Sequence, residues 1–121
     1  MRVGQPPLHT LGDALLSKHT VEAIWRTVED GDDVVIVHAE PKAILKQFAQ
    51  DPHGLSMRIY WANGNERIDL DNGSSITAIR DSERARGLTA NLLVAPLGLS
   101  EAQTAALMPT LAAAHGHLLG Y

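Results

Sequence analysis

The amino-acid sequence predicts an α/β fold: a mostly parallel sheet flanked by helices, with an antiparallel hairpin or meander insert. Residues 34–37 and 92–95 are short apolar runs without polar alternation, typical of strands buried on both faces of a parallel sheet. Helical periodicity on both sides of the first run gives the alternation of helix and strand that characterises α/β proteins. Residues 56–79 alternate apolar and polar side chains around turn signals, which predicts the insert.

Length and composition indicate a single folded domain over residues 1–121. The chain is 45% hydrophobic and 20% charged, which argues against disorder and against a multi-pass membrane protein. It has no cysteine, so disulfides, thiolate metal sites and cysteine nucleophiles are excluded. The net charge of −4 provides no long-range positive field, so we expect any contact with nucleic acid to be local and weak.

The two ends of the chain indicate its compartment. The first eleven residues contain two prolines and no apolar segment of signal-peptide length, so we expect an irregular lead-in and no export. The most apolar stretch, residues 102–119, is interrupted by polar residues and is too broken to span a membrane. The sequence therefore predicts a cytoplasmic protein, with no membrane partner.

The elements of the first half follow from periodicity and end signals. Apolar positions at helical spacing predict a helix over 13–30, and Gly31 stands where a helix-terminating glycine belongs. The strand 34–37 comes next. Pro41 then opens a second helix, which runs to about residue 49. We expect these elements to form an α–β–α series.

The insert and the charged loop after it complete the middle of the chain. Strands are expected at 56–61, 67–70 and 74–79, and Asn63-Gly64 between the first two is a strong hairpin signal. Residues 80–86 carry several charges and are predicted to form a loop. The three strands should therefore make a small antiparallel meander.

The last third of the chain is almost uncharged. The strand 92–95 ends at Pro96, and Ser100 is the expected cap of a helix over about 101–114, which Pro109 should kink or interrupt. A final strand is expected at 117–121. Between residues 87 and 121 the only charged side chain is Glu101, so this region forms core or covers a partner.

Three segments carry a resemblance to a known family. They are WANGNERIDLDNGSSI at residues 61–76, RGLTANLLV at 86–94, and LSEAQ leading to MPTL at 99–111. In this order they resemble the ATPase domain of phage terminase large subunits, the motors that package viral DNA. The likeness runs from about residue 16 to the end of the chain. It implies a P-loop NTPase fold, here in a truncated and catalytically degenerate form.

The nucleotide-binding loop that the resemblance implies is incomplete. A Walker A loop needs glycine-rich backbone, a lysine for the β- and γ-phosphates and a hydroxyl for magnesium. Gly12 and Lys18 have the spacing of that motif, but Ser17 replaces a glycine and His19 takes the hydroxyl position, with Thr20 one residue late. Lys18 and Thr20 are therefore interpreted as a nucleotide-binding remnant, with an ordinary exposed Lys18 as the alternative.

The catalytic acidic pair of the family is also missing. The resemblance places the magnesium-binding Asp and the catalytic Glu on Pro96 and Leu97, which can neither hold a metal nor act as a base. We therefore expect an inactive relative without catalytic residues and without a cofactor.

Other chemistry-bearing residues have simpler interpretations. Arg80, Arg84 and Arg86 form a basic loop that could contact nucleic acid or a partner, although interleaved Asp81 and Glu83 favour a solvated, salt-bridged loop. His115 and His117 are ordinary surface histidines rather than a metal pair, because no third ligand is evident. Trp25 and Trp61 are expected to be core anchors.

The leading functional hypothesis is a non-enzymatic phage or prophage protein that binds another protein. Loss of the strand before the Walker A loop should leave strands 91–95 and 117–121 to pair with each other or with a second chain. We expect a homodimer, or docking onto a terminase or capsid-vertex protein, which would modulate packaging or superinfection. The alternatives are an ATPase fragment completed in trans and a small DNA-binding module.

Overall fold

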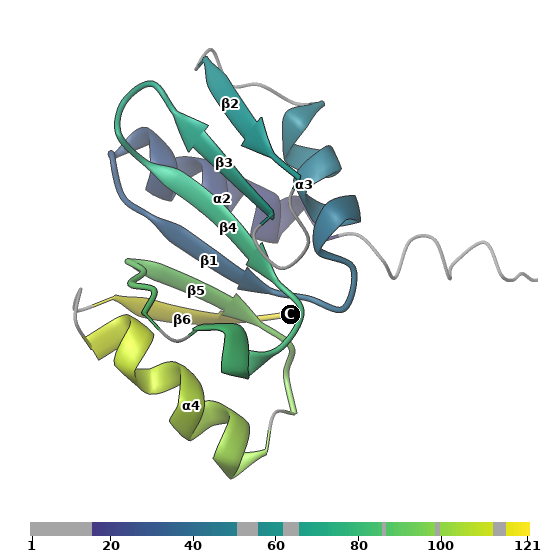
Figure 1. Ribbon diagram of the computed structural model, residues 1–121, viewed down its shortest axis with the longest axis vertical. Helices are drawn as coiled ribbons and strands as arrows, with labels where there is room; N and C mark the ends of the chain where they lie inside the picture. The colour runs from purple at the N-terminus through teal and green to yellow at the C-terminus, as the bar shows by residue number, and fades with distance from the viewer. Residues whose placement is uncertain (1–15, 51–55, 62–65, 86, 99, 113–115) are drawn as a thin grey trace, which may run out of the picture.

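The structure is a computed structural model, and it describes residues 16–50, 56–61, 66–85, 87–98, 100–112 and 116–121 (Figure 1). The predicted lead-in at 1–11 lies outside these ranges. So do Gly12, which the resemblance places in an incomplete Walker A loop, the predicted turn at Asn63-Gly64, Arg86 and His115.

One six-stranded mixed sheet organises the fold, in the order β2-β3-β4-β1-β5-β6. The strands are β1 (Val34–Val37), β2 (Met57–Tyr60), β3 (Glu66–Leu70), β4 (Ser75–Ile79), β5 (Leu92–Ala95) and β6 (His117–Gly120). Strands β4, β1, β5 and β6 run parallel to one another, whereas β2, β3 and β4 form the antiparallel meander. The predicted α/β class and the meander are confirmed.

Helices cover both faces of this sheet (Figure 1). Helices α2 (Lys18–Glu29) and α3 (Pro41–Ala49) pack on one face, and α4 (Glu101–Ala112) with the short 3-10 helix η1 (Ser82–Ala85) packs on the other. Two hydrophobic clusters result, one on each face of β1 and β5. These two central strands are buried along their whole length, as their sequences predict.

The larger cluster includes one of the two tryptophans. Trp25 is 1% exposed, and its ring meets that of Phe48 edge to face with centroids 5.6 Å apart. Trp61 is 41% exposed, so its assignment to the core was wrong. It follows β2, which lies at one edge of the sheet, where only part of a large side chain finds neighbours.

Helix α2 begins later than its periodicity suggests. Ser17 is the N-cap residue, and its Oγ accepts a hydrogen bond from the backbone N–H of Thr20, so the predicted start at residue 13 was wrong. The predicted end is confirmed. Gly31 has φ +87°, and its N–H donates to the carbonyl of Val28 while Asp32 N–H donates to that of Thr27, the pair of bonds of a Schellman motif.

Helix α4 starts where the sequence predicts, but it is not interrupted at Pro109. Ser100 and Gln103 form a reciprocal capping box, in which Ser100 Oγ accepts from Gln103 N–H at 3.1 Å and Gln103 Oε1 accepts from Ser100 N–H at 2.9 Å. The helix continues through Pro109, so the predicted interruption did not occur. Pro109 has no N–H, so the helix continues without the hydrogen bond that this residue would otherwise donate to the carbonyl of Ala105.

Candidate functional site

The parallel strands place several chemistry-bearing residues at one edge of the sheet. His38 follows β1, Arg80 follows β4, Pro96 follows β5 and Tyr121 follows β6. Because these strands are parallel, the four residues lie at the same, carboxyl edge. Open α/β sheets bind their ligands outside this edge, so it is the first place to search for a function.

His38 and Tyr121 pack against each other at the centre of the carboxyl edge. Their rings stack with centroids 5.5 Å apart and 21° between the planes. The Tyr121 hydroxyl donates to the Val37 carbonyl oxygen at 2.6 Å, and Tyr121 N–H donates to the Ala95 carbonyl at 3.1 Å. The end of β6 is thereby fastened to both β1 and β5.

The protonation of this pair follows from its burial. Glu40 N–H donates to His38 Nδ1 at 2.9 Å, which leaves the proton of the neutral ring on Nε2. Burial lowers the pKa of His38, and the nearby Glu40 carboxylate partly opposes this effect. Burial also raises the pKa of Tyr121 to about 12. Both rings are therefore neutral near pH 7.

The end of β5 holds an apolar turn where the resemblance puts acidic residues. Leu97 N–H donates to the Tyr121 carbonyl at 3.0 Å, so the chain after Pro96 folds back along β6. The Leu97 side chain is 77% exposed and lies directly against Gly120, where an added Cβ would collide with it. This strand end is covered by hydrocarbon and provides no carboxylate oxygen from Pro96 or Leu97.

Lys18 and Thr20, which the resemblance suggests as a nucleotide-binding remnant, have different environments. Lys18 is the first residue of α2 and is exposed. Thr20 is buried, and its Oγ1 lies 3.1 Å from Ser17 Oγ within the cap of α2. The Thr20 hydroxyl thus takes part in the helix start, while Lys18 remains accessible to solvent.

The basic loop that contains Arg80 and Arg84 also carries acidic side chains. Arg84 lies 3.9 Å from Asp81, and both side chains are about half exposed. Arg80 lines a hollow of about 270 Å³ together with Glu40 and Lys42 at the start of α3 and with Glu66, the first residue of β3. Glu66 is only 4% exposed. The described part of this loop therefore presents both signs of charge, which does not favour a phosphate-binding surface.

A further feature escaped the sequence analysis: a hollow beside the edge strand β6. It measures about 280 Å³ and is lined by residues without charge, namely Ala95, Pro96, Leu97, Gly98, Thr104, Leu118 and Gly120. Leu118 is 52% exposed, and Met108 of α4 is 47% exposed. The signal in the sequence was the scarcity of charge after residue 87, but the hollow itself depends on how β5, β6 and α4 pack.

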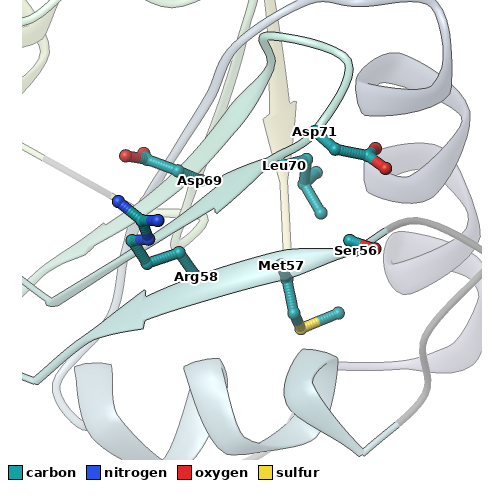
Figure 2. Close-up of a pocket in the computed structure, with 6 residues that line it drawn as sticks. All are labelled: Ser56, Met57, Arg58, Asp69, Leu70 and Asp71. Atoms are coloured by element: carbon teal, nitrogen blue, oxygen red, sulfur yellow. The ribbon is translucent and has the colours of Figure 1, made fainter.

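A second hollow of about 290 Å³ lies at the opposite edge of the sheet, beside β2 and β3 (Figure 2). Figure 2 shows Arg58 and Asp69 on one side of these strands and Met57 on the other. Asp69 also forms an ion pair with Arg67 at 2.9 Å, with both side chains well exposed. This hollow is a surface depression of mixed polarity, and its Asp69 is already paired with Arg67 on the same strand.

Comparisons of the chain with models of protein families, with curated proteins and with solved structures found no match. The resemblance to terminase ATPase domains therefore stays a prediction from the sequence. Within the described ranges, no group of three or more His, Cys, Asp or Glu side chains could hold a metal ion. None of the helices in the described part of the chain has the length and apolar character needed to cross a lipid bilayer.

Proposed function

We propose that this protein is a non-enzymatic binding module, a degenerate terminase ATPase scaffold of phage or prophage origin that acts by binding another protein. The observation that carries the proposal is the edge strand β6, where Leu97 and Leu118 are exposed around an uncharged hollow. An open strand edge beside an apolar surface is a favourable site for protein association.

The carboxyl edge supports the non-enzymatic part of the proposal. The stacked rings of His38 and Tyr121 fill its centre, and Leu97 covers the end of β6. Phosphoryl transfer depends on a metal ion and on charge neutralisation at the γ-phosphate. Pro96 and Leu97 provide neither of these, and the Thr20 hydroxyl is engaged in a helix cap.

The proposal is tested by calorimetric titration of the purified chain with ATP and magnesium, together with an assay for phosphate release. We expect no heat of binding and no turnover, and we expect Lys18→Ala to behave like the natural sequence. Micromolar binding that Lys18→Ala abolishes, or magnesium-dependent turnover by the chain alone, would overturn the proposal.

An ATPase completed in trans is the alternative. It requires that a partner add a glycine-rich loop and acidic residues next to Lys18 and β5. The same assay, repeated with purified phage terminase components, separates the two functions. Turnover that appears only in the mixture and is lost in Lys18→Ala would favour the alternative, whereas binding without turnover would favour the proposed scaffold.

A further inference from the structure

We propose that the partner of β6 is a second copy of this chain, whose β6 adds antiparallel to form one continuous sheet across a two-fold axis at Leu119. This inference rests on the proposed binding function and specifies its partner. Among the described residues, β6 is the last strand of the sheet, with β5 on its inner side.

The hydrogen bonds between β6 and β5 show which residues of β6 direct their backbone groups away from β5. His117 N–H donates to the Asn91 carbonyl and Tyr121 N–H donates to the Ala95 carbonyl, so these residues direct their peptide groups toward β5. Peptide groups alternate in direction along a strand. Leu118 and Gly120 therefore present their N–H and C=O groups at the open edge.

Two copies related by a two-fold axis can pair through the outward-facing backbone groups of Leu118 and Gly120. With the axis at Leu119, Leu118 of one copy pairs with Gly120 of the other, and each pair exchanges two hydrogen bonds. Directly paired residues of antiparallel strands have their side chains on the same face of the sheet. Leu118 of each copy is thus placed over Gly120 of the other.

The hollow beside β6 accommodates this side chain. Gly120 and Leu97 form part of its lining; the exposed Leu97 side chain lies against Gly120, so it must rotate aside where the second copy's Leu118 arrives. Leu118 is 52% exposed in the single chain, so the pairing would bury apolar surface on both copies. Each copy contributes the same knob and the same hollow, as a two-fold interface requires.

Charge also favours a second copy. The hollow beside β6 is lined by uncharged residues, and Glu101 is the only charged side chain of residues 87–121. A partner segment with charged residues would lose hydration against this surface without gaining an ion pair. The β6 edge of a second copy is uncharged as well, so neither surface would bury an unpaired charge when the two copies associate.

The first test is sedimentation equilibrium of the full chain over a wide concentration range. We expect a monomer–dimer equilibrium, and we expect Leu118→Lys to raise the dissociation constant by about 100-fold because the substitution occurs twice in the interface. Met108→Lys is the matched control, since Met108 is 47% exposed on α4 but is not paired in this register. An unchanged dimer in Leu118→Lys would overturn the inference.

The second test fixes the register with a single cysteine. The chain has none, so Leu119→Cys introduces one thiol. Facing residues at the axis are about 4.5 Å apart between Cα atoms, within the range of a disulfide. Mild oxidation should link two Leu119→Cys chains rapidly and two Met108→Cys chains far more slowly, whereas equal rates would overturn the register.

The outcomes separate this inference from the proposed function. A chain that stays monomeric, or that dimerises through another surface, contradicts the inference. Whether the protein is non-enzymatic is then still decided by the titration with ATP and the assay for phosphate release. If amide hydrogen exchange shows Leu118 and Gly120 protected in a chain that sediments as a monomer, a segment of the same chain occupies the edge and the inference fails. Protection that increases with concentration supports it.

Discussion

The Tyr121 hydroxyl reaches over β5 and donates a 2.6 Å hydrogen bond to the carbonyl oxygen of Val37. The two residues are 84 positions apart in sequence. They connect the end of β6 to the end of β1, although β5 separates these strands in the sheet. The bond holds β6 in register and thereby keeps its outer edge in the geometry that the proposed interface needs.

Removing this hydroxyl should weaken the fold without disturbing the ring stacking. Tyr121→Phe loses the bond to Val37 and leaves a carbonyl oxygen without that donor, so we expect the free energy of unfolding to fall by about 1–2 kcal/mol. Urea denaturation at pH 7 measures the change. Tyr60→Phe is the matched control because Tyr60 is exposed at an edge strand. Equal losses in the two variants would contradict the role of the bond.

Acid should destabilise the protein through His38. Burial lowers its pKa, so the unfolded chain binds this proton more readily than the folded chain does. The stabilising contribution is fully present above the ordinary histidine pKa of 6.5, which applies to the unfolded chain. It is lost as the pH falls through the lower pKa of the folded state.

Denaturation of the natural chain and of His38→Asn at a series of pH values between neutral and acid checks this expectation. The asparagine keeps an acceptor for Glu40 N–H but does not titrate, so its stability should fall less steeply below neutral pH. An identical pH dependence in the two proteins would show that His38 is not the group responsible.

Two glycines, Gly116 just before β6 and Gly120 at its end, should respond very differently to substitution by alanine. A Cβ at Gly116 would lie 2.6 Å from the backbone oxygens of Ala90 and Asn91, which cannot move without distorting the sheet. Gly116→Ala is therefore expected to cost about 2–3 kcal/mol of stability. At Gly120 the nearest neighbour is the end of the Leu97 side chain, which can rotate away, so Gly120→Ala should cost far less.

Thermal unfolding of both alanine variants measures the difference. Leu97→Ala combined with Gly120→Ala removes the colliding side chain and should recover most of any loss at residue 120. A larger loss in Gly120→Ala than in Gly116→Ala would contradict the packing at this edge.

Asn72 should stabilise the junction between α2 and the meander. Its Nδ2 donates to the Val28 carbonyl at 2.6 Å, and its Oδ1 accepts from the N–H and the hydroxyl of Ser74. Asn72→Asp retains the acceptor, loses the donor and places a negative charge beside the C-terminal end of α2. We expect a loss of about 1–2 kcal/mol.

Chemical denaturation at low and high salt checks the Asn72 prediction. Salt should recover the part of the loss that comes from charge and leave the part that comes from the missing hydrogen bond. A variant as stable as the natural chain at low salt would show that the bond to Val28 contributes little.

Much of the fold was predictable because its signals are local. The apolar runs 34–37 and 92–95 are buried strands, and the alternating segments around residues 56–79 form the meander. Gly31 ends α2 as expected. The start of α2 was misplaced because apolar Leu15 and Leu16 extend the helical periodicity beyond Ser17, whose side chain caps the helix.

The candidate site was predictable only in part. The absence of an acidic side chain at Pro96 and Leu97 is visible in the sequence, as is the scarcity of charge after residue 87. The exposure of Trp61 was missed because the position of β2 at a sheet edge depends on strand order. Strand order results from long-range pairing, which leaves no local pattern.

The sequence by itself determined the α/β class, the two buried central strands and the uncharged character of the last third of the chain, because periodicity and composition act over a few neighbouring residues. Only the tertiary structure decided that His38 stacks on Tyr121 and that Leu97 packs against Gly120. It also placed Leu118 beside a hollow at the open edge of β6. These contacts depend on which strands lie side by side, and the free energy of packing the whole sheet determines that order.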